Sequence, residues 1–384
     1  MDVKQVYEIV NGALSQSLGE TSLLTEDLSN VVDVGSTVFD NQAFDAYSKA
    51  LVNQIGRMIF VNRVYTGAAP SVLRDGWEYG SVLAKVSSKM PRAVENESWE
   101  LTDGASYDPN VFHKPFVLER FYNKMTTFEI EQSITERQVK QSFTSGAELS
   151  AFVAMLFNEV EKSLTVSREE LIMKTINNMT AETVYDAFNG SAITGAGNVR
   201  AVNLLSRYNT AYSKSLTAAA AVIDPDFIRY AAYQMALTTA RLRRVSTLFN
   251  LGGQERFTPM DRQHVVMLSD FRSAADIFLQ SNTFHDEYTK LQQAETVPYW
   301  QGSGTSYAFS DVSSIQVATV AGHSQTVSGI LAVMFDHDAL GVTNENNRVT
   351  TQYNAKAEFT NYFYKSDARY FNDFNENFVV FYVA

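Results

Sequence analysis

Histidines beside carboxylates are the residues of this sequence that could most readily do chemistry. They form two clusters, Asp336-His337-Asp338 and His285-Asp286-Glu287, and both group types can ligate a divalent metal ion. Adjacent residues on a strand point to opposite faces, so each cluster would supply only one or two ligands. Asp336 and Asp338 also follow an apolar stretch, where a turn is expected. We therefore interpret the first cluster as a turn, with an acidic metal-dependent enzyme as the alternative.

Other chemical motifs are weak or absent in the sequence. There is no cysteine, which excludes disulfides and thiolate chemistry. Gly195-Ala196-Gly197 is a fragment of a phosphate-binding pattern and is interpreted as a connector, because no good strand precedes it. Asn344-Glu345-Asn346-Asn347 is predicted to be a polar loop, since it lacks the carboxylate spacing of a calcium loop. We expect no catalytic residue, no metal site, no cofactor and no enzymatic activity.

Composition points to a chain that hides part of its surface against partners. Of 384 residues only 19% are charged, and there are 25 Phe, 19 Tyr and 3 Trp. The net charge of −12 argues against a general polyanion-binding surface. Arg241, Arg243 and Arg244 are a local basic cluster, which we interpret as a solvated helix face. No apolar run approaches the length of a membrane span, so no membrane partner is expected.

The elements that would position any site begin with an arm over the first 40 residues. Apolar residues recur there at helical spacing, among them Val6, Tyr7, Val10 and Leu14. A helix is predicted over residues 41–56, ending at Gly56. A strand is predicted over Met58–Tyr65. Such short helices need something to pack on, either a neighbouring subunit or the chain's own core.

A long hairpin is predicted next. Residues 77–86 and 111–122 are strand candidates, the second continuing to Ile130, and about twenty-five polar, turn-rich residues separate them. A hairpin of two strands is at best marginally stable alone in water, so a projecting one is expected to lie on another surface.

The strongest periodic signal lies between Ser145 and Asn178 and predicts one long spine helix. Its apolar stripe, expected to face the core, consists of Leu149, Phe152, Val153, Leu156, Phe157 and Val160. Ser145 followed by Glu148 is typical of a capping box at the N-terminus.

The rest of the chain alternates helix and strand patterns and then becomes β-rich. We predict helices over residues 226–249 and 269–279, with a buried strand over His264–Leu268 between them. Strands are predicted over residues 330–335, 349–356, 360–370 and 377–384. The class is therefore α+β.

This order of elements resembles the major capsid (head) proteins of tailed phages with the Hong Kong 97-like fold, in particular those of small short-tailed phages. In that family the parts are an N-terminal arm, an extended β-hairpin (the E-loop), a P-domain with a long spine helix, and an A-domain. The resemblance implies five regions. They are the arm and helix (1–57), the extended hairpin (58–135), the P-domain with the spine helix (136–190), the A-domain (191–325) and the return to the P-domain sheet (326–384).

The resemblance also implies a function. Copies of the chain would assemble as pentamers and hexamers into a procapsid and then an icosahedral or prolate head around double-stranded DNA, without sequence-specific binding. The implied partners are a separate scaffolding protein and a portal, with assembly in the host cytoplasm and the virion as final location. Lys85, Lys89 and Lys114 lie in the hairpin, but no carboxylate can be assigned to covalent cross-linking, so a non-covalent shell is expected. Another phage virion or tail protein is the alternative.

Two sets of inter-subunit contacts follow from the resemblance. The hairpin set combines aromatic residues and Met as anchors with charged residues that set register, namely Trp77, Tyr79, Met90, Arg92, Glu95, Glu97 and Trp99. The arm set is Val6, Tyr7, Val10 and Leu14.

Overall fold

The computed structural model contains two compact units, each discontinuous in sequence. Unit 1 comprises residues 1–78, 125–174 and 342–370, and unit 2 comprises residues 79–124, 175–341 and 371–384. The residues that the structure describes are 3–19, 23–40, 44–62, 69–74, 83–88, 91, 93–190, 193, 195–280, 294–302, 306–318 and 322–384. Three elements contribute residues to both units: helix α5 (Gly146–Phe188) and strands β11 (Leu340–Asn354) and β12 (Phe359–Asn372).

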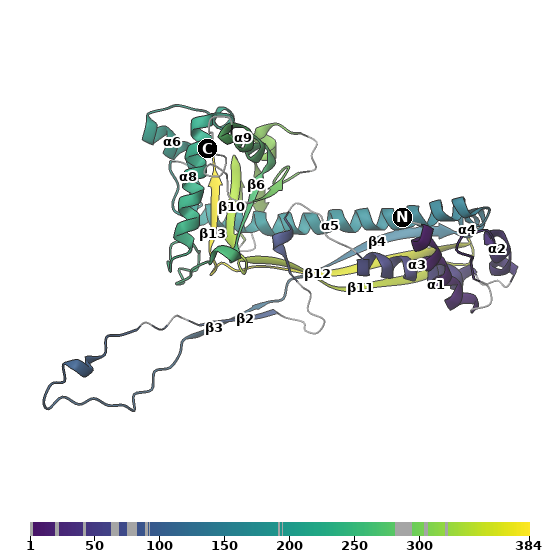
Figure 1. The fold of residues 1–384 in the computed structure, drawn as a ribbon, viewed down its shortest axis with the longest axis horizontal. Coiled ribbons are helices and arrows are strands. Elements are labelled where there is room, and N and C mark those ends of the chain that lie inside the picture. Colours follow the sequence, from purple (N-terminus) through teal and green to yellow (C-terminus); the bar gives the residue numbers. More distant parts are fainter. Residues whose placement is uncertain are drawn as a thin grey trace. The chain divides into compact units, whose positions relative to one another are not determined.

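Unit 1 is built on a four-stranded sheet in the order β1-β11-β12-β4 (Figure 1). Strand β1 (Leu73–Arg74) runs parallel to β11, and β4 (Met125–Thr135) runs antiparallel to β12. Burial alternates along β12, so that Thr360, Tyr362 and Tyr364 are buried on one face. This is the period of two expected for a sheet with one face on a core.

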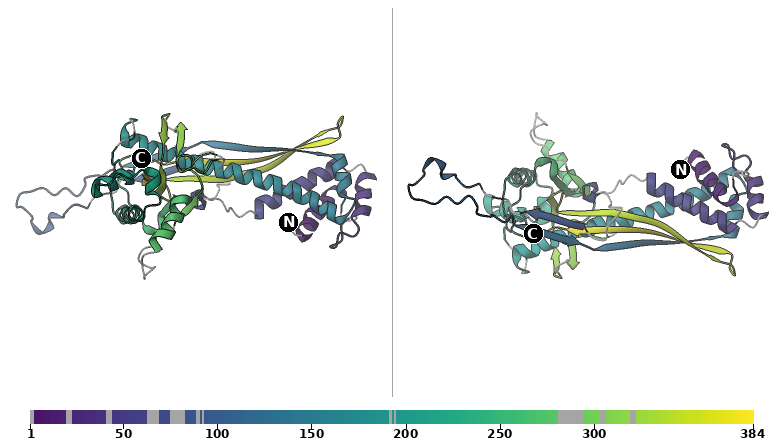
Figure 2. Two further views of the ribbon diagram at one scale, coloured as in Figure 1. Left: turned by 90° about the horizontal axis from the view of Figure 1, so that it is seen from above. Right: turned by 90° about the horizontal axis from the view of Figure 1, so that it is seen from below.

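Helices cover that buried face. The core of unit 1 joins Tyr362 and Tyr364 of β12 to Val153 and Leu156 of α5 and to apolar residues of the N-terminal helices. Figure 2 shows α5 running along the strands of this sheet. The other helices of unit 1 are α1 (Val3–Leu18), α2 (Val31–Asp40), α3 (Phe44–Asn62) and α4 (Glu136–Ser142), with the short 3₁₀ helix η1 (Pro70–Val72).

The spine helix is confirmed and is longer than its apolar stripe predicted. It is α5, with 43 residues, and the Ser145 hydroxyl accepts a hydrogen bond from the Glu148 N–H at 3.2 Å. Its last part, from Thr175 to Val184, is buried in unit 2 on every side. That stretch contains buried polar residues such as Asn177 and Thr183, so the apolar periodicity fades although the helix continues.

Unit 2 is centred on a five-stranded mixed sheet in the order β5-β13-β10-β6-β7. Its two middle strands, β10 (Ile330–Asp336) and β13 (Phe378–Tyr382), are buried along their whole length, because helices pack on the sheet. The remaining strands are β2 (Leu83–Ser88), β3 (Val117–Tyr122), β5 (Ala201–Asn203), β6 (Gln263–Leu268), β7 (Glu295–Val297), β8 (Ile315–Ala318) and β9 (Ser324–Val327). The helices are α6 (Leu204–Tyr212), α7 (Ala218–Ala221), α8 (Pro225–Leu242), α9 (Ser269–Gln280) and α10 (Phe309–Val312), with 3₁₀ helices η2 (Glu97–Trp99) and η3 (Met260–Arg262).

Several sequence predictions were wrong locally, and the reason for three of them follows. The strand predicted from Met58 is helical as far as Asn62, because α3 continues past Gly56 alongside α1. The helix predicted over 226–249 ends at Leu242, whose carbonyl accepts from the Thr258 N–H at 2.7 Å. The polar stretch 344–347 lies within β11, because pairing with β12 satisfies its backbone whatever the side chains are.

An ion pair between two strands of unit 1 gives a test of this sheet. Asp367 on β12 pairs with Arg348 on β11 and accepts a 2.7 Å hydrogen bond from the Thr127 hydroxyl on β4. Burial alone would raise the pKa of Asp367, but the hydrogen bonds from Arg348 and Thr127 outweigh it and hold the pKa below its ordinary value of 3.8. A depressed folded-state pKa adds stability that is present above the unfolded-state pKa and is lost as the pH falls through the folded-state pKa.

Asp367→Asn should therefore lower the free energy of unfolding by about 1 kcal/mol at pH 7, since Arg348 is partly exposed and solvent screens the pair. Below pH 3.8 the difference between the variant and the natural chain should shrink. Urea unfolding at about pH 7, 4 and 3 measures it. Glu129→Gln, which breaks the more exposed pair with Lys365, is the control and should change little. An equal loss at every pH would show that the carboxylate charge does not matter.

Candidate assembly interface

The hairpin predicted to contact a neighbouring subunit is formed by β2 and β3. They pair antiparallel, with Lys85 opposite Arg120. Beyond them the chain forms a loop (Figure 1), and every described side chain from residue 93 to residue 116 is exposed. We call residues 93–116 the hairpin loop. Apart from η2, the loop has no regular helix or strand, so nothing within it buries its own side chains.

Only part of the predicted hairpin set falls on described residues. Trp77, Tyr79, Met90 and Arg92 lie outside them. Glu97 is described as part of η2, and Glu95 is exposed in the loop. Trp99 is 94% exposed, although tryptophan is among the residues most enriched in interface cores. The contact of these residues with a neighbouring subunit stays a prediction.

Apolar exposure continues along the whole hairpin. Phe112 is 82% exposed and Val94 is 88% exposed. The other large apolar residues exposed in β2, in β3 and in the loop between them are Val86, Leu101, Tyr107, Val111, Phe116, Val117 and Phe121. Scattered exposed apolar residues are normal on a protein surface, but so many on one hairpin mark it as a candidate interaction surface.

The base of the hairpin is fixed by a cluster of charges that the sequence analysis missed. We call Lys85, Arg120, Arg256, Asp373 and Glu376 the hairpin anchor. The Lys85 ammonium lies 2.7 Å from Asp373 and 2.9 Å from Glu376. Arg120 reaches Asp373 at 3.5 Å, and Arg256 reaches Glu376 at 3.3 Å. Both strands of the hairpin are thereby tied to the turn between β12 and β13.

Burial gives the anchor its electrostatic character. The Asp373 side chain is 3% exposed and that of Lys85 is 22% exposed. Burial works against the charged form of Lys85, but the charges and hydrogen bonds of Asp373 and Glu376 outweigh it and raise the pKa of Lys85. Burial also raises the pKa of Glu376, despite the charges of Lys85 and Arg256. Asp373 is the closer of the two carboxylates to Lys85, and it also accepts a hydrogen bond from the Asn375 N–H at 3.0 Å.

The predicted arm residues contact their own chain. Val6, Val10 and Leu14 are buried in the core of unit 1, where α1 packs along α3. Tyr7 is half-buried. The apolar stripe that we assigned to a neighbour therefore packs on α3 of its own chain. From the sequence, two ways to bury this stripe were open: a neighbouring subunit or the chain's own core. A contact of the arm with another subunit stays a prediction, one that would use the exposed face of α1.

The six spine-helix residues lie on the core side of α5. Leu149, Val153, Leu156 and Val160 are buried, and Phe152 and Phe157 are half-buried and pack against the same cluster. They hold the helix on the sheet of unit 1.

The two acidic histidine clusters differ in what the structure describes. Asp336 ends β10 and its carboxylate accepts from the Asp338 N–H at 2.8 Å, which confirms the predicted turn. Asp338 pairs with Arg262, and His337 lies 3.0 Å from His264, ring nitrogen to ring nitrogen. His285-Asp286-Glu287 lies outside the described residues. Among the residues that are described, no group of three or more His, Asp or Glu could hold a metal ion.

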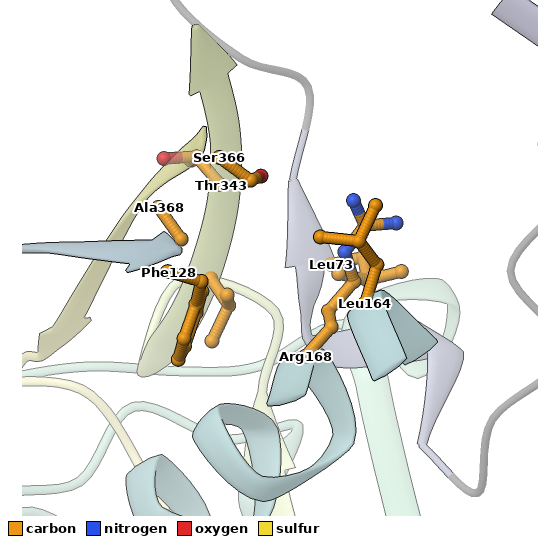
Figure 3. A pocket seen from close by; sticks show the side chains of 8 residues that line it. Leu73, Phe128, Leu164, Arg168, Thr343, Ser366 and Ala368 are labelled. Atoms are coloured by element: carbon orange, nitrogen blue, oxygen red, sulfur yellow. The ribbon is translucent and has the colours of Figure 1, made fainter. Parts of the chain in front are cut away.

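A small pocket in unit 1 offers little room for a ligand. Figure 3 shows Leu164 and Arg168 of α5 and Leu73 of β1 facing residues of the sheet, among them Phe128 and Ala368. Its volume of about 10 Å³ accommodates roughly one water molecule. Nor is any helix of the described part of the chain long and apolar enough to cross a membrane. The exposed apolar side chains of the hairpin make it the candidate functional surface.

Comparison with solved structures shows the fold. The capsid structure of Staphylococcus phage Andhra superimposes with a TM-score of 0.50 at 11% identity, covering 84% of this chain and 86% of that chain. A chain in the structure of the head fiber and inner core protein gp22 of bacteriophage P68 superimposes with a TM-score of 0.52 at 8% identity, with the same coverage of both chains. Both are far below the identity at which function could be transferred.

Comparison of the sequence shows the family. A search of curated protein sequences found no match. The sequence profile of the Phi29-like phage major capsid protein family, however, matches residues 8–382, nearly the whole chain. The match covers the arm, the hairpin, the spine helix and the sheets of both units. The chain therefore belongs to the Phi29-like phage major capsid protein family, and it is a capsid-forming protein of the phage virion.

Proposed function

We propose that copies of this chain assemble by docking the hairpin loop of one copy on the next, as pentamers and hexamers of an icosahedral or prolate head. The observation that carries this proposal is the combination of an exposed apolar loop with a buried charged anchor at its base. A loop whose only requirement was solubility would need neither exposed apolar side chains nor a buried charged anchor. Because the anchor fixes the direction of the strands, the loop is presented in one orientation to a partner.

Docking of this kind would contribute favourable energy to assembly. Burial of a large apolar side chain stabilises a contact by about 1.5–3 kcal/mol, before the cost of ordering the loop. Trp99 and Phe112 are two such side chains, and both are almost fully exposed in the isolated chain. Each subunit in a closed ring gives one such contact and receives another, so modest contacts add up across the shell.

The remaining partners follow from the proposed assembly. A separate scaffolding protein and a portal would direct procapsid formation in the host cytoplasm. Double-stranded DNA would be enclosed without sequence-specific binding, which the net charge of −12 supports because like charges repel. The shell would be non-covalent and the chain would catalyse no reaction. In support, Lys85 is engaged by Asp373 and Glu376.

The double variant Trp99→Ala/Phe112→Ala tests this function. We expect no shells or rings by light scattering and electron microscopy when it is co-expressed with its scaffolding protein, while its thermal unfolding matches that of the natural chain. The control is Ile277→Ala, which truncates a side chain that is 65% exposed on α9, away from the hairpin. Normal shells from the double variant would show that the loop does not carry assembly.

A further inference from the structure

A basic and apolar surface lies at the C-terminal end of α8. We call Arg241, Arg243, Arg244, Val245, Leu248 and Phe257 the arginine patch. The three arginines are exposed, and Val245, Leu248 and Phe257 are 51%, 57% and 48% exposed. Ser246 and Arg256 exchange backbone hydrogen bonds of 2.9 and 3.0 Å, so the next residues, Val245 and Phe257, are cross-strand neighbours. Val245 and Phe257 are therefore held together next to Arg244 in the chain.

The charge of this region is opposite to that of the chain. Residues 241–262 contain five arginines and two carboxylates, a net charge of +3 in a chain of −12. Arg256 and Arg262 pair with Glu376 and Asp338. Within the described part of the chain, none of the three patch arginines has an ion pair. Such a cluster, next to exposed apolar side chains, suits a partner that is both acidic and apolar.

The hairpin loop has that composition. Residues 93–116 contain five carboxylates and one lysine, a net charge of −4 with histidine neutral. The side chains of Glu95, Glu100, Asp103 and Asp108 are exposed, and they alternate with the exposed apolar residues Val94, Trp99 and Leu101. The loop lies in the same unit as the patch but does not cover it, since both are exposed.

We propose that the arginine patch of one copy is the surface that receives the hairpin loop of a second copy. This inference rests on the proposed function and names the receiving surface. Arginines of the patch would pair with loop carboxylates, while Val245, Leu248 and Phe257 would cover Trp99 and its apolar neighbours. Charge complementarity of this kind fixes register and speeds encounter.

The place of the patch in unit 2 supports a ring. The Gly252 N–H donates to the Phe374 carbonyl at 2.8 Å, and the Phe378 N–H donates to the Phe249 carbonyl at 2.9 Å. The patch segment is thus tied to the turn that carries the hairpin anchor. A loop docked there would reach the base of the next hairpin, which is a head-to-tail contact. Such contacts generate closed rings when the rotation between copies closes.

Cross-linking tests the contact directly, because the natural chain has no cysteine. Full-length Ser98→Cys, in the loop, is co-assembled with Thr247→Cys, an exposed position in the patch segment, and treated with a short bismaleimide. We expect covalent dimers in shells only when both variants are present. Ser215→Cys is the control. Ser215 follows α6. The residue at the N-terminal cap of α6, Asn203, bonds to Ala384, whereas Phe249 of the patch segment bonds to Phe378 at the opposite end of β13. Ser215→Cys should therefore give no dimer with Ser98→Cys.

Charge reversal tests the complementarity. Arg241→Glu/Arg243→Glu/Arg244→Glu should reduce shell yield about tenfold or more, and so should Glu95→Lys/Glu100→Lys/Asp103→Lys. The chain with all six changes has the natural net charge and should regain shells.

Two outcomes would overturn the inference. If the variant with all six charge changes is folded but forms no shells, and Ser98→Cys cross-links to another surface, the patch is not the receiving surface. The proposed function would still stand if Trp99→Ala/Phe112→Ala abolishes shells. If patch reversal leaves shells intact and only weakens binding of a short DNA duplex, the patch contacts nucleic acid instead.

Discussion

Asp373→Ala is expected to release the hairpin from unit 2 and to abolish shell assembly. Asp373 accepts from both strands of the hairpin, through Lys85 at 2.7 Å and Arg120 at 3.5 Å. Its loss leaves Lys85 partly buried, with Glu376 as the other carboxylate that pairs with it and the Asp338 carbonyl as a hydrogen-bond acceptor. Removal of one member of a buried ion pair costs about 3–5 kcal/mol. Because Lys85 keeps that partner and some contact with solvent, we expect a smaller loss, about 2–3 kcal/mol.

Two measurements separate release of the hairpin from general unfolding. Limited proteolysis should cut the segments around β2 and β3 faster in Asp373→Ala, while the circular dichroism of the helices is unchanged. Light scattering should show no shells. Lys85→Met removes the partner charge and leaves the buried carboxylates of Asp373 and Glu376 side by side, so it should be at least as destabilising as Asp373→Ala. Glu136→Ala, which breaks an exposed pair with Lys140, is the control and should assemble normally. If Asp373→Ala assembled as the natural chain does, the anchor would not position the hairpin.

Prediction from sequence succeeded for the elements whose patterns are local. The apolar stripe of Leu149 to Val160 predicted α5, and the short apolar run from His264 predicted β6. It failed where tertiary contacts determine the secondary structure. The polar residues 344–347 are in β11 because a neighbouring strand pairs with them, and this pairing leaves no sign in the residues themselves.

The hairpin anchor shows the same limit at the candidate interface. Lys85 is almost three hundred residues from Asp373 and Glu376, so no spacing rule connects them. One local signal was available. Residues 372–377 are polar except for Phe374 and lie between β12 and the apolar strand β13, yet most of them are buried. Buried polar residues must be paired, so a polar run enclosed by core strands points to a partner elsewhere in the chain.

The tryptophans show why exposure, which the sequence does not give, decides function. Trp99 and Trp300 are the same residue type, but one is 94% exposed and the other 1% exposed. From the sequence, Trp99 was expected at an interface because it lies in a polar hairpin, whereas Trp300 received no role. The structure distinguishes the two residues. The same substitution should therefore affect assembly at Trp99 and stability at Trp300.

Trp300→Ala is expected to lower the free energy of unfolding of unit 2 by about 3–5 kcal/mol, the usual range for a buried Trp to Ala change. Its indole N–H donates to the Ile330 carbonyl at 2.9 Å, and its own carbonyl accepts from the Asn177 side chain on α5 at 2.6 Å. The cavity would therefore open between the end of the spine helix and the start of β10. Denaturant unfolding should detect the loss, and soluble yield should fall.

The matched control is Trp99→Ala, the same chemical change in the hairpin loop. It should leave the unfolding midpoint unchanged and weaken assembly, whereas Trp300→Ala should lose stability first and assembly only as a consequence. The distinction is measurable, because chains of Trp300→Ala that do fold retain the loop and should still join shells formed by the natural protein. Equal unfolding midpoints for the two variants would contradict the burial of Trp300, and exclusion of folded Trp300→Ala chains from mixed shells would place a second assembly determinant near β10.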